Sequence, residues 1–157
     1  MVYYLKEVRI IKQILTAAKA LFENAKQNIS LLANASAFIN QEIEKINWVG
    51  FYLYLDDKLC LGPFQGKPAC EVINLNEGVC GFAFKEQKLT NVPDVEQFEG
   101  HIACDNASKS ELVIPLTKDN FKIGVLDVDS PILNRFDPKT VELLKQIAEL
   151  VVKYYKL

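Results

Sequence analysis

Apolar residues recur at helical spacing through the first third of the chain. The first stripe alternates spacings of three and four and consists of Val8, Ile11, Leu15, Ala18 and Phe22. This stripe predicts a helix over 5–27. Ser30 is a residue type that favours helix starts, and the second stripe behind it ends near Ile43. No glycine or proline occurs before Gly50, so this third is predicted to be helical.

From residue 47 onward the apolar pattern changes to a period of two, which is typical of strands. The expected strands are 47–55, 58–65, 69–75, 89–92, 110–116 and 121–130. Turn residues at Asp56-Asp57 and at Lys118-Asp119-Asn120 predict two hairpins. A short helix is expected over 78–87. The segment 93–108 has no usable period and predicts a long loop, a feature that is often functional in compact domains.

The last helix has a clear start, with Asp137 as its N-cap and Pro138 at its first position. The expected order is then two helices, three strands, one helix, three strands and one helix. Hairpins between the strands indicate an antiparallel sheet of about six strands with the terminal helices packed on it, an α+β fold. We find no linker and no repeat, so residues 1–157 are interpreted as one domain.

Composition excludes several classes of protein. The chain has 157 residues, of which 50% are hydrophobic, and a net charge of −2, which argues against a partner that is a nucleic acid or an anionic membrane. Its longest apolar stretch, Trp48 to Leu55, is far shorter than the ~20 residues that a membrane helix needs. Charged residues at 6, 7 and 9 argue against an export signal. We therefore expect a cytoplasmic protein, in a compartment where structural disulfides are rare.

Two carboxylates continue an apolar strand face. Period two places Ile123, Val125, Asp127 and Asp129 together, and the predicted hairpin places Glu111 across from the last two. The carboxylates either point into solvent at the strand end or line a pocket for a cation, an amine or a protonated oxygen. An Asp-x-Asp pair can ligate a metal in principle, but the chain has one histidine and no histidine–carboxylate spacing, so no metal is expected.

Aromatic residues share one face of the first strand, where Trp48, Gly50, Tyr52 and Tyr54 alternate with apolar neighbours. This face is either an ordinary aromatic core or the wall of a ligand pocket, with Gly50 leaving room for close approach.

The four cysteines contain no Cys-x-x-Cys pair, which excludes a zinc knuckle and a thioredoxin-type motif. Cys60 lies between two leucines and is expected to be a small buried apolar residue. Cys104 lies in the long loop and is a candidate reactive thiol, although Asp105 would raise its pKa. His101 is only three residues from Cys104, which gives hydrolase chemistry weak support, and we interpret it as structural.

Several blocks of sequence occur together in a recognisable order. They are NWVGFY (47–52), LGPFQGKPAC (61–70), GVCG (78–81), VPDV (92–95), GHIACD (100–105), SE (110–111) and GVLDVDSP (124–131). Together they resemble the free methionine-R-sulfoxide reductases, which are single-domain GAF proteins. The resemblance runs from Asn47 to Phe136, and the NKFDE-type signature of nucleotide-binding GAF sensors is not found.

The resemblance implies roles for three cysteines. Cys104 matches the catalytic cysteine, and Cys70 matches the resolving cysteine that forms a disulfide with it. Cys80 matches an auxiliary third cysteine, whereas Cys60 has no counterpart. Thioredoxin is the implied reductant, and no metal or organic cofactor is implied. A homodimer is compatible with the sequence.

The resemblance also implies a substrate pocket. Trp48 packs on the substrate methyl group, and Tyr52 belongs to the same wall. Glu111, Asp127 and Asp129 surround the sulfoxide and the bound amino acid, with Glu111 and Asp129 expected to share the proton and Asp127 to orient the site. The alternative function is a non-catalytic GAF sensor module, in which the cysteines are incidental.

Overall fold

The computed structural model of the protein describes residues 2–100 and 105–157, with side chains from residue 8 onward. Its strands form one six-stranded antiparallel sheet in the order β3-β2-β1-β6-β5-β4. They are β1 (Trp48–Leu55), β2 (Lys58–Gly66), β3 (Val72–Asn74), β4 (Thr90–Val92), β5 (Ser110–Lys118) and β6 (Phe121–Ser130). This architecture confirms the predicted α+β fold.

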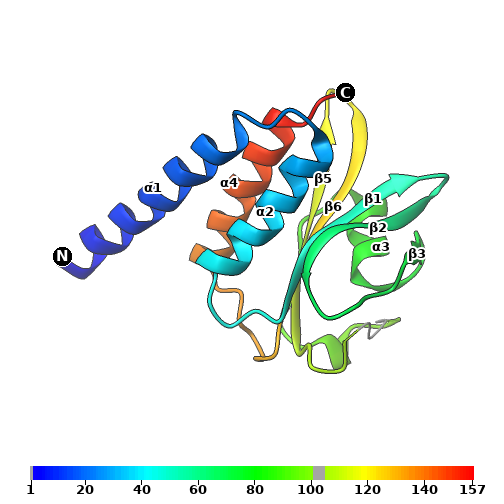
Figure 1. Ribbon diagram of the computed structural model, residues 1–157. Coiled ribbons are helices and arrows are strands. Elements are labelled where there is room, and N and C mark those ends of the chain that lie inside the picture. The colour runs from blue at the N-terminus through cyan, green and yellow to red at the C-terminus, as the bar shows by residue number, and fades with distance from the viewer. Residues whose placement is uncertain (1, 101–104) are drawn as a thin grey trace.

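Helices cover both faces of the sheet. They are α1 (Val2–Phe22), α2 (Asn28–Glu42), α3 (Gly78–Glu86), the short 3-10 helix η1 (Val95–Gln97) and α4 (Pro138–Tyr154). Figure 1 shows α2 and α4 side by side over one face, α3 against the other, and α1 reaching outward from its contact with α4. Among the described residues, no helix is both long and apolar enough to cross a membrane.

Two hydrophobic cores lie on opposite sides of the sheet. The helix-side core packs α2 and α4 against strand residues such as Leu112, Leu126 and Val128. The pocket-side core packs α3 against Val113 and Val125. The faces alternate residue by residue along the same two strands, as the pleat requires. Residues 110–116 follow the predicted alternation, with Leu112, Ile114 and Leu116 in the helix-side core.

Ile123 departs from the predicted face. It belongs to the helix-side core, whereas Val125 belongs to the pocket-side core. The cause is a β-bulge: Leu116 pairs with Gly124 and Thr117 with Lys122, which leaves Ile123 without an opposite residue. Gly124 has a φ of +149°, and a Cβ there would overlap the Tyr52 carbonyl oxygen on β1, so the close approach requires glycine.

Ser30 is not the N-cap of the second helix. The helix starts at Asn28, with Gln27 at the cap position and no side-chain cap. Asn28 Nδ2 donates to the Lys156 carbonyl at 2.7 Å, and Lys156 N donates back to Asn28 Oδ1 at 2.8 Å. This contact with the chain's far end fixes the helix start more strongly than the local preference of serine. The first helix also ends at Phe22 rather than at residue 27.

The C-terminal elements follow the prediction closely. Asp137 accepts a hydrogen bond from Thr140 N at 2.7 Å, and Pro138 opens α4. The β5–β6 turn is tighter than predicted, because Lys118 still pairs with Phe121 and only Asp119 and Asn120 form the turn. Both have positive φ, at 48° and 67°, as two-residue hairpin turns require.

Candidate active site

Strand register brings two carboxylates and an indole into one row. Asp129 on β6 pairs with Trp48 on β1 and with Glu111 on β5. Residues that pair directly across antiparallel strands project to the same face. The predicted juxtaposition of Glu111 with the end of β6 is therefore present, and it lies on the pocket side of the sheet.

The next row contains Gly50, Asp127 and Val113. The space beside Gly50 is filled by protein: a Cβ there would overlap Phe64 Cβ and lie 2.6 Å from the outer edge of the Trp48 ring. Gly50 thus makes room for the indole and for Phe64, and this space is not available to a ligand as the pocket-wall alternative had it. Asp127 faces a cavity lined also by Trp48 and Tyr52.

The carboxyl groups are removed from bulk water. Glu111 and Asp127 are each only 6% exposed, and Asp129 beside them is half-buried, so the solvent-pointing alternative does not hold. Burial, followed by the charge of Asp129, raises the pKa of Glu111 well above its usual value. Burial, followed by Glu111, raises the pKa of Asp127, and burial, followed by Asp127, raises the pKa of Asp129. These carboxyls therefore hold protons at a pH where surface carboxylates have lost them.

Helix α3 adds a thiol to this cluster. Cys80 is buried, and its Sγ lies 4.0 Å from Glu111 Oε1. Burial, followed by the charges of Asp127 and Glu111, raises the pKa of the Cys80 thiol. Ligand atoms of Cys80, Glu111 and Asp127 all lie within 4.8 Å of one another, which is a spacing that a metal ion can use.

Aromatic rings on β1 lie beside the carboxyl cluster on the same face of the sheet. Trp48 stacks on Phe64 with ring centroids 5.3 Å apart and on Tyr52 at 5.9 Å. The indole Nε1 donates to the Lys67 carbonyl at 3.1 Å, and Tyr52 Oη donates to the Cys70 carbonyl at 3.1 Å. Burial raises the pKa of Tyr52, so its hydroxyl stays a donor. The two aromatic residues thus tether the segment that carries Cys70 to β1.

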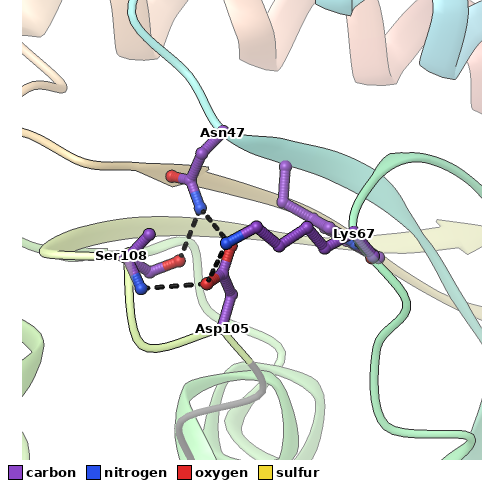
Figure 2. Close-up of polar contacts among 6 residues, drawn as sticks. Asn47, Lys67, Asp105 and Ser108 are labelled. Atoms are coloured by element: carbon purple, nitrogen blue, oxygen red, sulfur yellow. Dashed lines mark hydrogen bonds and ion pairs between the residues drawn. The ribbon is translucent and has the colours of Figure 1, made fainter.

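A polar cluster at the mouth of the cavity was missed by the sequence analysis. Asp105 accepts hydrogen bonds from Asn47 Nδ2 at 3.1 Å and from Ala107 N at 2.9 Å, and it pairs with Lys67 Nζ at 3.4 Å. Figure 2 shows Asn47 also reaching Ser108, whose Oγ lies 3.0 Å from its Nδ2. The only signal for this cluster was that Asn47, Lys67 and Asp105 lie in three of the blocks that carry the family resemblance, with no spacing to join them.

The cluster has the opposite electrostatics to the cavity interior. The hydrogen bond from the Ala107 amide has the largest effect and lowers the pKa of Asp105; burial opposes it, and the Asn47 and Lys67 side chains lower the pKa further. Asp105 is therefore ionised at the rim, next to carboxyls that resist ionisation inside. Asn47 Oδ1 is buried, and among the described residues it finds no hydrogen-bond partner.

The cysteines have different surroundings. Cys104 and His101 lie outside the described residues. Cys70 is disulfide-bonded, and Cys60 and Cys80 carry free thiols. Cys60 is half-buried rather than buried, because the pleat turns Leu59 inward and leaves Cys60 on the other face, paired with the exposed Val72.

Comparison with known proteins agrees with this geometry. The sequence profile of the GAF domain family matches residues 9–153. The chain is 46% identical over 134 residues to the free methionine-R-sulfoxide reductase of Escherichia coli (strain K12), covering 85% of this chain and 81% of that protein. Curated relatives thus share nearly the whole of the described sheet and its helices.

Solved structures give the same picture. The reduced form of fRMsr from Staphylococcus aureus superimposes with a TM-score of 0.89 at 46% identity, covering 93% of this chain and 95% of that one. The free methionine-R-sulfoxide reductase of Neisseria meningitidis, solved in complex with its substrate, gives 0.88 at 36% identity, covering 92% and 87%. In both cases the similarity covers more than nine-tenths of this chain.

Proposed function

The chain belongs to the GAF domain family and, within it, to the free methionine-R-sulfoxide reductases, and from this premise we propose that it reduces free L-methionine-(R)-S-oxide to L-methionine through the thiolate of Cys104. The observation that carries this proposal is the buried carboxyl cluster beside Trp48. Glu111 and Asp129 face each other across paired strands, and burial raises the pKa of both.

The chemistry needs such an acid. A sulfoxide oxygen is a poor leaving group until it is protonated, so a carboxylic acid that keeps its proton near neutral pH accelerates its departure. Glu111 and Asp129 share this proton in our proposal, and Asp127 orients the site from the next row. Trp48 packs on the S-methyl group and helps to select the R epimer.

The reaction then proceeds in two redox steps. The Cys104 thiolate attacks the electrophilic sulfur of the sulfoxide. The substrate sulfur is reduced to the thioether of methionine, and the protonated oxygen is transferred to Cys104, which becomes a sulfenic acid. The Cys70 thiol attacks this sulfenic acid, which forms a Cys70–Cys104 disulfide and releases one water molecule. A cytoplasmic dithiol of the thioredoxin class then reduces this disulfide, which regenerates both thiols and oxidises the reductant to its own disulfide. The bonded state of Cys70, beside free thiols at Cys60 and Cys80, supports this pairing.

The acidic cavity also favours the free amino acid over a methionine sulfoxide residue in a protein. A free substrate carries an ammonium group that donates hydrogen bonds to carboxyl oxygens, whereas the nitrogen of a methionine sulfoxide residue in a protein is a neutral amide. The test compares free methionine-R-sulfoxide, its S epimer and an N-acetylated R-sulfoxide amide under thioredoxin recycling, and only the first is expected to turn over. Comparable kcat/KM for the blocked compound would contradict this preference.

Cysteine variants test the pathway directly. Cys104→Ser should abolish reduction. Cys70→Ser should release one equivalent of methionine and accumulate a Cys104 sulfenic acid that dimedone traps. Cys60→Ser is the matched control and should turn over normally, since Cys60 faces away from the pocket. Turnover by Cys104→Ser above background would reject the nucleophile, and substrate binding without oxidation of two thiols in the native chain would favour a sensor module instead.

A further inference from the structure

Cys80, Glu111 and Asp127 form a second functional arrangement within the cavity. Their ligand atoms come from three elements, α3, β5 and β6, and all lie within 4.8 Å of one another. All three side chains are at least nine-tenths buried. The reduction proposed above uses Glu111 as an acid but gives the Cys80 thiol no required step.

Asp127 supplies an independent sign of a missing ligand. Its Oδ1 atom is buried, and no described residue offers it a hydrogen bond. A buried carboxyl oxygen without a partner is costly, because no hydrogen bond replaces those it made to water in the unfolded chain. Asp127 lines the cavity, so this oxygen belongs to a site that a small ligand can reach.

We propose that Cys80, Glu111 and Asp127 bind a divalent zinc ion. One thiolate with two carboxylates is a donor set that suits Zn²⁺, whereas Ca²⁺ and Mg²⁺ take six or more oxygen ligands. Three protein ligands leave a fourth tetrahedral position, which opens toward the cavity and holds water.

The geometry requires only a modest closure. Ligand atoms around tetrahedral zinc lie roughly 3.4–3.6 Å apart. The Cys80 Sγ to Glu111 Oε1 distance is 4.0 Å, so side-chain rotation brings both atoms into range. On binding, the ion replaces the thiol proton and the carboxyl protons, which pass to the buffer. The dication also offsets the mutual repulsion of the carboxylates.

Binding here has a consequence that rests on the proposed function. Zinc would hold Glu111 and Asp127 as ligands, so the acid that protonates the sulfoxide would be lost. Zn²⁺ is therefore an expected inhibitor of the reductase, although the site itself requires no reductase activity. Failure of zinc binding would leave the reductase proposal intact, and failure of reduction would leave the metal site intact.

The test uses the full chain in its disulfide form, so that Cys70 and its partner are unavailable as thiolate ligands. Zn²⁺ is titrated by calorimetry in a buffer that does not chelate metal, and Cd²⁺ is titrated while the ultraviolet thiolate-to-metal charge-transfer band is recorded. The native chain and the matched control Cys60→Ser should bind one ion and show the band. Cys80→Ser should lose the band and at least about tenfold in zinc affinity.

Asp127→Asn is nearly isosteric and guards against a folding defect in Cys80→Ser. It should keep the fold by circular dichroism, keep the Cd²⁺ band through Cys80, and lose at least about tenfold in zinc affinity. No binding by the native chain, equal affinity in Cys80→Ser and the native chain, or loss of the band only in Cys60→Ser would each overturn the proposal.

Discussion

The two faces of the sheet are built from the same strands but have different roles: one packs an apolar core and the other lines the acidic pocket. On the side covered by α2 and α4, β5 and β6 contribute Leu112, Leu126 and Val128. One residue away along each strand, the other side receives Glu111 and Asp127. The pleat therefore lets one pair of strands carry an apolar surface on one face and a buried acidic surface on the other.

The comparison indicates that stability and activity are separable in this chain. Apolar burial on the helix side favours folding, whereas burial of carboxyls on the pocket side opposes their ionisation. A substitution in the helix-side core should thus change stability and leave the reaction rate of the folded enzyme nearly intact, whereas loss of a pocket carboxyl should chiefly change the rate.

Neutral amides on the pocket face should remove activity. Glu111→Gln and Asp129→Asn each lose a proton donor, and loss of a general acid typically costs 10²–10⁴-fold in rate. The measurement is single-turnover release of methionine from the reduced enzyme. The exposed Glu149→Gln on α4 is the control and should match the native rate. Near-native rates in both pocket variants would mean that neither carboxyl supplies the proton.

A cavity on the helix face should remove stability. Leu144 is fully buried on α4, and Leu→Ala substitutions in cores typically cost 2–5 kcal/mol. Urea unfolding should show this loss for Leu144→Ala, while the folded fraction reduces substrate at the native rate. Ile29→Ala is the matched control because Ile29 is 63% exposed. Equal costs for the two variants, or loss of activity without loss of stability, would break the separation of the faces.

The face assignments were predictable where regular strands carried them. Period two and a hairpin placed Glu111 near Asp127 and Asp129, because the long strands β5 and β6 pair over most of their length. Ile123 could not be assigned in this way. Its bulge depends on Gly124 meeting the Tyr52 carbonyl on a neighbouring strand, which is a tertiary contact.

The polar cluster at the mouth of the cavity could not be predicted from the sequence, for a related reason. Asn47 and Asp105 are 58 positions apart, and Lys67 and Asp105 are 38 apart. Polar residues in loops have no period, so nothing in the pattern joins them. The family resemblance identified the candidate cysteines. It did not reveal that the ionised carboxylate of Asp105 lies at the mouth of a cavity whose own carboxyl groups hold protons.

The unfolding free energy should fall as pH rises. Burial raises the folded-state pKa of Glu111, Asp127 and Asp129, whereas the unfolded values are about 4. At a pH between the unfolded-state and the folded-state pKa values, the folded chain therefore binds more protons than the unfolded chain. The contribution of these carboxyls to the unfolding free energy is complete below about pH 4 and is lost as pH rises through their folded-state pKa. For each carboxyl, the loss is about 1.4 kcal/mol for every pH unit by which its folded-state pKa exceeds its unfolded-state pKa. Asp105 has the opposite sign, since its pKa is lowered and its contribution disappears in acid.

Urea unfolding at a series of pH values from about 4.5 to 7.5 checks this sign. Asp127→Asn should flatten the slope because one elevated carboxyl is removed. Asp105→Asn is the control from the rim and should leave the slope in this range unchanged, since its titration lies below the range. Identical slopes in the native chain and Asp127→Asn would show that Asp127 does not titrate with an elevated pKa.

The smallest effect should come from the ion pair at the rim. Lys67 is 70% exposed and its partner Asp105 is 10% exposed, with 3.4 Å between Nζ and Oδ1. Water and salt screen such a pair, so Lys67→Gln should lower the urea midpoint slightly at low salt and not at 1 M salt, where the Debye length is about 3 Å. Lys19→Gln removes the exposed pair between Lys19 on α1 and Glu23 just after its end, and is the matched control. Because Asp105 keeps its hydrogen bonds from Asn47 and Ala107, the lysine adds charge to an already ordered carboxylate. A loss that persists at 1 M salt would instead show that the Lys67 side chain contributes through packing, and that the rim belongs with the buried core rather than with the solvent-screened surface.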